Sequence, residues 1–128
     1  MVTVAARLLP RVDSPGHTVL VVDDDPSIRL LCRINLELAG WDVREAGGLD
    51  DARAQVGDVD VVVLDLHVGS GSGVELLDEV RRDHPRVKVA MLTGSDRLEG
   101  VDSDAVITKP FTIDQLTSTV ASLAPSAG

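Results

Sequence analysis

Acidic side chains directly follow two of the most apolar segments in this sequence. The segment VLVV runs straight into Asp23, Asp24 and Asp25. A second segment, VVVL at 61–64, is closed by Asp65. Crowded carboxylates repel one another, so their charges must be solvated by water or bound to a cation. The pattern leaves two interpretations open, a solvated loop or a cation site.

A hydroxyl group and an ammonium group follow two later apolar segments. Thr93 comes directly after VKVAML at 87–92, and Lys109 comes shortly after AVI at 105–107. Taken alone, Thr93 could merely finish a strand, and Lys109 could be a surface lysine before a turn. Beside the acidic residues, they complete a set of polar groups that all lie at the ends of apolar segments.

Five short segments are predicted to be strands. Four of them are nearly continuous apolar runs rich in valine, which suits strands buried on both faces of a parallel sheet. The segment 41–45 instead alternates apolar and polar residues, as a strand at a sheet edge does. The predicted strands are 18–22, 41–45, 59–64, 87–92 and 105–107.

Helical patterns fill the intervals between these strands. After the first strand, Asp25 is suited to cap a helix that begins at Pro26 and ends at Gly40. A weaker helix is predicted at 47–56, and further helices at 72–83 and 112–123. The expected inner face of the first helix comprises Ile28, Leu31, Cys32 and Leu38, with Cys32 as a small buried hydrophobe.

Two of the later helices carry sequence signals for their first turn. Ser72 with Glu75, and Thr112 with Gln115, have the spacing of capping boxes. The expected inner face of the last helix comprises Ile113, Leu116, Val120 and Leu123.

The order of these elements predicts an α/β fold with a doubly wound, five-stranded parallel sheet. We expect the strand order 2-1-3-4-5, which reverses between the first and third strands. Ligands bind beyond the carboxyl ends of the strands at such a switch point. Asp23, Asp24 and Asp65 should therefore converge there, with Thr93 and Lys109 nearby.

The residues at the ends of the predicted strands follow one another in an order that resembles the receiver domain of two-component response regulators. The resemblance covers roughly residues 17–124. An acidic pair, a single aspartate, a threonine and a lysine–proline pair follow one another in that family's order. The resemblance implies a flavodoxin-like fold, which agrees with the pattern of elements. It divides the chain into a lead-in at 1–16, a receiver domain at 17–124 and a tail at 125–128.

The resemblance also assigns roles to the acidic residues. Asp65 is the implied phosphoacceptor, and Asp24 and Asp65 would hold Mg²⁺ directly. Asp23 would act on the metal through water, and the backbone carbonyl of His67 would complete the protein ligands. Mg²⁺ suits such a site because it takes oxygen ligands, retains waters and binds phosphate. Asp25 is then left to cap the following helix.

The function implied is that of a receiver protein in a two-component or phosphorelay system. A histidine kinase or phosphotransfer protein would donate a phosphoryl group to Asp65, with Thr93 and Lys109 each holding a phosphoryl oxygen. An unknown downstream protein would read the change through protein–protein interaction. No enzymatic activity is expected beyond self-phosphotransfer and autodephosphorylation.

Two other functions remain as alternatives. One is a pseudo-receiver, an interaction module that is never phosphorylated. The other is a small phosphatase of the haloacid dehalogenase type, because DDDPS superficially matches the Asp-x-Asp start of that family. That family also needs a further acidic cluster after the lysine, and only Asp114 is available here.

The composition limits which partners and which cellular compartment are expected for this protein. The net charge of −9 argues against direct binding to nucleic acid or to anionic membranes. No apolar run approaches the roughly 20 residues of a membrane span. The single cysteine fits a reducing compartment, so a cytoplasmic location is expected.

Three departures from the family pattern are evident. The segment LHVGSGSG follows Asp65 where the family has a methionine–proline–glycine turn, and it should form a looser loop. Val106 stands where the family has an aromatic residue. Only ten residues, Ser95 to Asp104, link the fourth strand to the fifth, so the fourth helix should be short or absent, because a crossover needs at least ~10–12. The last two departures fall on the surface that signals output, not on the site.

Overall fold

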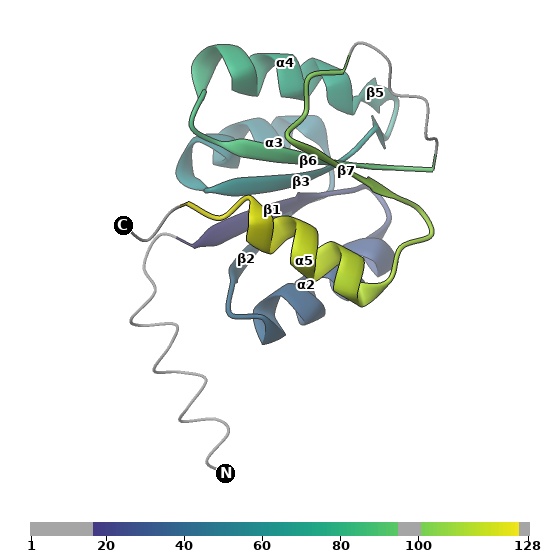
Figure 1. Cartoon of the computed structure of the whole chain (residues 1–128). Helices are drawn as coiled ribbons and strands as arrows, with labels where there is room; N and C mark the ends of the chain where they lie inside the picture. The colour runs from purple at the N-terminus through teal and green to yellow at the C-terminus, as the bar shows by residue number, and fades with distance from the viewer. Residues whose placement is uncertain (1–16, 95–100, 126–128) are drawn as a thin grey trace.

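A five-stranded parallel sheet forms the centre of the molecule (Figure 1). The computed structural model describes residues 17–94 and 101–125. The sheet order is β2-β1-β3-β6-β7, which confirms the predicted order of the five main strands. Their bounds are Thr18–Val22 (β1), Asp42–Ala46 (β2), Val61–Asp65 (β3), Lys88–Thr93 (β6) and Ala105–Thr108 (β7).

Helices cover both faces of this sheet. Figure 1 shows α2 and α5 on one face and α3 and α4 on the other. The bounds of the helices are Pro26–Leu38 (α2), Leu49–Gln55 (α3), Gly73–Asp83 (α4) and Ile113–Ser122 (α5). A short 3-10 turn, η1 (Val56–Asp58), continues from α3. In the parts of the chain that the structure describes, no helix is long and apolar enough to cross a membrane.

Alternate residues of the central strands supply two separate apolar cores. Leu20 of β1 and Leu64 of β3 pack towards α3 and α4. Val21 and Val63 of the same strands pack towards α2 and α5. Successive side chains of a strand point to opposite faces, so strands covered on both sides must be apolar throughout. This requirement explains the unbroken valine-rich runs in the sequence.

The predicted helix starts are largely confirmed. The side chain of Asp25 accepts a hydrogen bond from the amide of Ser27 (2.8 Å), and Pro26 is the first residue of α2. Thr112 and Gln115 form a reciprocal capping box with distances of 3.0 and 2.8 Å. The expected Ser72–Glu75 box is only half present. Ser72 caps the amide of Val74, whereas the Glu75 carboxylate pairs with Arg53 at 3.1 Å.

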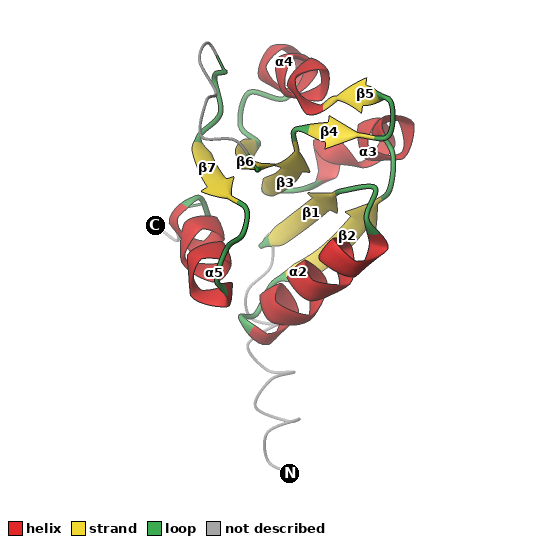
Figure 2. Ribbon diagram, turned by 90° about the vertical axis from the view of Figure 1, so that its right-hand side faces the viewer, coloured by secondary structure: helices red, strands yellow, loops and turns green. Residues whose placement is uncertain are grey.

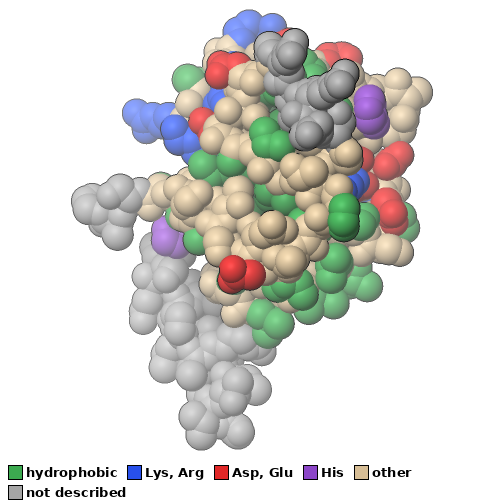
Figure 3. Space-filling view, turned by 45° about the vertical axis from the view of Figure 1, so that its right-hand side comes forward, with side chains coloured by type: hydrophobic (Ala, Val, Ile, Leu, Met, Phe, Trp, Pro, Cys, Tyr) green, Lys and Arg blue, Asp and Glu red, His purple; other side chains and the backbone are tan. Residues whose placement is uncertain are grey.

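The inner faces predicted for α2 and α5 were partly wrong. Cys32 and Leu36, one turn apart, are the buried residues of α2, and burial raises the pKa of the Cys32 thiol to about 11. Leu38 is 70% exposed and Leu31 is 39% exposed. An α-helix rotates by 100° per residue, so these two side chains point away from the face that carries Cys32 and Leu36. Ile113 at the start of α5 is also exposed. Figure 3 shows apolar side chains gathered on the lower part of the visible surface.

A small antiparallel hairpin follows β3 and was not predicted. It consists of β4 (His67–Val68) and β5 (Gly71–Ser72), and it lies beside the main sheet (Figure 2). Val68 is buried in the core on the α3 and α4 side, which anchors the hairpin. Gly69 occupies the turn with φ +60°, a conformation that glycine adopts without steric cost. The segment that follows Asp65 therefore contains a short hairpin.

An arginine of α4 braces the short connection into β7. Arg81 donates hydrogen bonds to the carbonyl of Asp102 at 2.9 and 2.7 Å and to the carboxylate of Asp104 at 2.9 Å. The Asp104 carboxylate also accepts from the amide of Val89 (2.7 Å). Residues 101–104 form no helix, and the preceding residues 95–100 lie outside the described part of the chain. Val106, in place of an aromatic residue, is half-exposed on β7.

Candidate functional site

Three carboxylates meet at the carboxyl ends of β1 and β3. Asp65 is the last residue of β3, and Asp23 and Asp24 directly follow β1. The two strands are neighbours in the sheet, with Val22 opposite Leu64. One oxygen from each of Asp23, Asp24 and Asp65 can be chosen so that all lie within 4.8 Å of one another. The convergence expected from the strand order is present.

Asp23 is the most constrained of these carboxylates. Its side chain is buried, and Oδ1 accepts a hydrogen bond from the amide of Asp25 at 2.9 Å. Oδ2 is buried and has no hydrogen-bond partner among the residues described, although Lys109 Nζ lies 3.5 Å away as an electrostatic neighbour. Burial raises the pKa of Asp23 above its ordinary value, and the charge of Asp65 adds to this rise. The Asp25 amide and Lys109 oppose the rise without cancelling it.

Lys109 joins the cluster from the end of β7. Its Nζ lies 3.5 Å from Asp23 Oδ2 and 3.5 Å from Asp65 Oδ1, so one ammonium group faces both carboxylates. The backbone amide of Lys109 donates to the carbonyl of Thr93 at 2.6 Å. The Lys109–Pro110 peptide bond is cis. Thr93 is the buried last residue of β6, so four neighbouring strand ends supply the predicted side chains.

Asp24 forms the exposed rim of the site. Its Oδ2 accepts a hydrogen bond from the amide of Gly69 at 2.9 Å, which ties the β4–β5 hairpin to the acidic cluster. His67, at the start of β4, is exposed two residues after Asp65. The sequence interpretation missed the tie to Gly69. The only local signal was the cluster of glycines, because a backbone amide donor leaves no trace in residue identity.

Gly73 is a second residue of the site that sequence reasoning missed. A Cβ atom at this position would collide with the backbone carbonyl oxygen of Asp65. The amide of Gly73 donates to the carbonyl of Leu66 at 2.6 Å, which closes the hairpin against β3. The first turn of α4 thus packs directly on the backbone that carries Asp65.

The donor set fits a small divalent cation. All of the converging atoms are carboxylate oxygens, which are the ligands that Mg²⁺ prefers. The buried Oδ2 of Asp23 lacks a hydrogen-bond partner in the described structure, and a buried polar atom left in that state costs free energy. Asp24 is exposed, so the cluster is open to solvent on one side.

The raised pKa of Asp23 should make the stability of the metal-free protein depend on pH. The folded state binds the proton of the Asp23 carboxyl more tightly than the unfolded chain does. The difference matters in a pH range that begins near 3.8, the ordinary pKa. The contribution of Asp23 to the free energy of unfolding is therefore fully present below pH 3.8, and it is lost as pH rises through the raised pKa. With EDTA at neutral pH, we expect Asp23→Asn to be more stable than wild type by about 1 kcal/mol.

Urea unfolding in EDTA from about pH 3 to about pH 8 measures this difference, since that range spans the ordinary carboxyl pKa. Asp58→Asn, which removes an exposed carboxylate from η1, serves as the matched control. The stability gap between Asp23→Asn and wild type should widen with rising pH, whereas the control should follow wild type. Parallel curves for all three proteins would contradict the assigned ionisation.

Comparisons with known proteins agree with this arrangement. Residues 19–121 match the response regulator receiver domain family. TcrX of Mycobacterium tuberculosis, described as a probable transcriptional regulatory protein, is 34% identical over 114 residues, which cover 83% of this chain and 49% of TcrX. The regulator RpaA of Synechocystis is 36% identical over 117 residues, covering 82% of this chain and 48% of RpaA. The chain thus spans about half the length of these relatives.

Solved structures show the same fold. The response regulator TrrA of Thermotoga maritima, in complex with Mg²⁺ and BeF, superimposes with a TM-score of 0.77 at 30% identity, covering 83% of this chain and 97% of TrrA. The chemotaxis response regulator CheY4 of Vibrio cholerae gives a TM-score of 0.75 at 28% identity, with coverage of 83% and 97%. On the sequence match and the shared fold together, the chain belongs to the response regulator receiver domain family.

Proposed function

We propose that this chain is the phosphoryl-accepting part of a cytoplasmic two-component or phosphorelay system, with residues 17–124 as the receiver domain and 1–16 and 125–128 as its flanks. Asp65 is the residue that accepts the phosphoryl group. The observation that carries the proposal is the position of Lys109 Nζ, at 3.5 Å from both Asp23 and Asp65, beside three converging carboxylates.

Mg²⁺ is the cofactor that we propose for this cluster. Asp24 and Asp65 would bind it directly, Asp23 through water, and the backbone carbonyl of His67 would be the remaining protein ligand. When bound, the cation offsets the negative charge of the carboxylates and of the phosphoryl group. The buried Oδ2 of Asp23 supports the assignment, because its charged neighbour Lys109 Nζ is as far as 3.5 Å away and a water on the metal would be a suitable hydrogen-bond partner.

The protein's own side chains carry out the other parts of the phosphoryl transfer. A carboxylate oxygen of Asp65 attacks the phosphorus atom, forming a new O–P bond as the bond between phosphorus and the donor's leaving group breaks. Lys109 already faces Asp65 Oδ1, so its ammonium group is placed to pair with a phosphoryl oxygen. Thr93, at the end of the adjacent strand β6, would donate its hydroxyl proton to another phosphoryl oxygen. These interactions position and stabilise the transferred group.

We propose a histidine kinase or a phosphotransfer protein as the phosphodonor and a further protein as the downstream target. The acidic balance of the chain argues against direct contact with nucleic acid. Asp24 and His67 on the exposed rim leave the cluster open to a partner that brings its own phosphohistidine.

The two alternatives are less well supported. A pseudo-receiver would have no use for three converging carboxylates, an arrangement that costs stability because burial and the charge of Asp65 raise the pKa of Asp23. A haloacid dehalogenase-type phosphatase needs another acidic group in the site. Asp114, the residue available for this role, is an exposed residue in the first turn of α5 and does not belong to the metal-binding cluster.

Labelling with a small phosphodonor tests the proposal. With Mg²⁺ and acetyl phosphate, intact mass spectrometry should show one added phosphoryl group that is stable in acid and labile in base. EDTA should prevent the addition. Absence of labelling would support the pseudo-receiver, and sustained turnover of p-nitrophenyl phosphate would support the phosphatase. Either result would overturn the proposal.

A further inference from the structure

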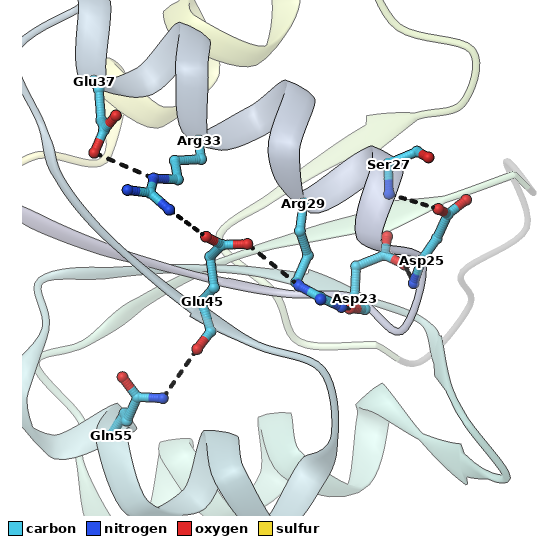
Figure 4. A network of polar contacts seen from close by, with 8 residues as sticks. All are labelled: Asp23, Asp25, Ser27, Arg29, Arg33, Glu37, Glu45 and Gln55. Atoms are coloured by element: carbon cyan, nitrogen blue, oxygen red, sulfur yellow. Dashed lines mark hydrogen bonds and ion pairs between the residues drawn. The ribbon is translucent and has the colours of Figure 1, made fainter.

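Arg29 of α2 reaches back to the backbone of the acidic cluster. Its Nη1 donates a hydrogen bond to the carbonyl oxygen of Asp23 at 2.6 Å (Figure 4). The Nε of the same guanidinium donates to the Glu45 carboxylate on β2 at 3.3 Å. One side chain thus joins the end of β1 to the neighbouring strand, and the guanidinium fork has the geometry for such a double contact.

Arg29 completes the fixation of Asp23. The amide of Asp23 donates to the carbonyl of Ala46 at 3.1 Å, and its side-chain Oδ1 accepts from the amide of Asp25. The Asp23 carbonyl, at the point where β1 has ended, is the group that Arg29 binds. These contacts fix both the backbone and the side chain of Asp23. They also fix the start of the backbone that carries Asp24, the next residue.

Glu45 holds Arg29 in this position. Its carboxylate lies between Arg29 and Arg33, which are one turn apart on α2, and Arg33 Nη1 approaches Glu45 Oε2 at 3.1 Å. Figure 4 shows this row of contacts continuing to Glu37 on one side, while Gln55 binds the Glu45 carbonyl on the other. The Arg29 and Glu45 side chains are 21% and 30% exposed, so the pair is only partly solvated.

Gly47 leaves the space that Arg29 occupies. A Cβ atom at position 47 would lie 3.1 Å from Arg29 Nη1, which is tighter than an ordinary van der Waals contact. The guanidinium therefore packs against bare backbone directly after β2. This close approach restricts the directions in which Arg29 can move.

We propose that Arg29 is a positioning residue that pre-organises the cation-binding carboxylates by holding the Asp23 carbonyl. This inference rests on the proposed function, because it concerns the same cation site. A site whose ligands are already fixed loses less conformational freedom on binding, which strengthens binding. Removal of the positive charge of Arg29 would by itself strengthen cation binding slightly. The effect should be small, because this charge is already paired with Glu45 and partly screened by water. Loss of positioning should dominate.

Three variants separate this role from general stabilisation. Arg29→Ala removes the contact with Asp23. Arg33→Ala is the matched control, because it removes the same charge from the same helix and the same Glu45 pair without touching Asp23. Arg29→Lys keeps the charge but lacks the fork that serves Glu45 and the Asp23 carbonyl together. It also remains testable if Arg29→Ala fails to fold.

Two readouts should respond. By calorimetric titration with Mg²⁺ alone, Arg29→Ala should raise the Kd about fivefold to tenfold, because only part of the free energy of the lost hydrogen bond is expressed in cation binding. Arg33→Ala should stay within about twofold of wild type, and Arg29→Lys should lie between wild type and Arg29→Ala. In the metal-free proteins, hydrogen exchange at the Asp25 amide, which reports on Asp23 Oδ1, should accelerate in Arg29→Ala but not in Arg33→Ala.

The outcomes discriminate between this inference and the proposed function. Equal effects of Arg29→Ala and Arg33→Ala on both readouts would reduce Arg29 to a structural role and overturn the inference. An unchanged Kd and unchanged exchange in Arg29→Ala would do the same, with the metal site intact. If wild type bound no Mg²⁺, the proposed function would fail, and the exchange readout in metal-free protein would still decide whether Arg29 holds Asp23.

Discussion

Asp65→Asn is expected to abolish phosphorylation of this protein completely. The carboxylate oxygen of Asp65 is the nucleophile in the proposed reaction, and an amide cannot form the acyl phosphate that results. The variant should fold at least as well as wild type, because it removes one of the converging negative charges. Acetyl phosphate with Mg²⁺, followed by intact mass spectrometry, should therefore show no added group, with an unchanged or higher melting temperature.

Two further variants sharpen the Asp65 experiment. Asp24→Ala should also prevent labelling, because it removes a carboxylate from the cation cluster while leaving Asp65 in place. Asp58→Asn changes an exposed aspartate in η1 and should be labelled like wild type. Labelling that persists in Asp65→Asn would show that another residue accepts the group, and the assignment would be wrong.

Gly73→Ala is expected to destabilise the fold strongly and to displace the phosphoacceptor. The new methyl group would collide with the carbonyl oxygen of Asp65, which belongs to the backbone of the central strand β3 and cannot rotate away. Relief requires α4 and β3 to move apart, and overpacking of this kind typically costs about 1–3 kcal/mol, occasionally more. Because the atom in the way is backbone, urea unfolding should show a loss near the upper end of this range, about 3 kcal/mol, or no folded protein.

Gly48→Ala provides the control for the Gly73 prediction. A Cβ atom at position 48 meets nothing within 4 Å, and the backbone there is extended. Its cost should stay near or below about 1 kcal/mol, the range for a changed helix cap. In addition, any folded Gly73→Ala protein should be phosphorylated more slowly than Gly48→Ala. Similar stability and labelling of the two variants would refute the close packing of α4 on Asp65.

Much of the fold could be predicted because its determinants are local. Valine-rich runs specify strands covered on both faces, and the observed β1 has the predicted bounds, Thr18–Val22. The alternating segment after Gly40 became the edge strand β2. Asp25 with Pro26, and Thr112 with Gln115, marked two helix starts through contacts that span only a few residues. Local patterns of this kind are encoded by residue type and spacing alone.

The meeting of Asp23, Asp24 and Asp65 was also predictable from sequence. In a doubly wound parallel sheet, all strands end at the same edge, so residues that follow adjacent strands are brought together whatever the helices do. Lys109 and Thr93 entered the prediction by the same rule. The sequence thus determined that the three carboxylates share the switch point and that Thr93 and Lys109 lie at the ends of the neighbouring strands.

Tertiary structure alone decided how those side chains are held. The hydrogen bonds from Gly69 to Asp24 and from Arg29 to the Asp23 carbonyl involve backbone atoms, which every residue possesses. The raised pKa of Asp23 depends mainly on burial, which is a property of the assembled layers. Exposure of Leu38 likewise followed from the direction in which α2 faces the sheet. Residue identity names the groups available for contact, but only packing sets their distances, directions and access to water.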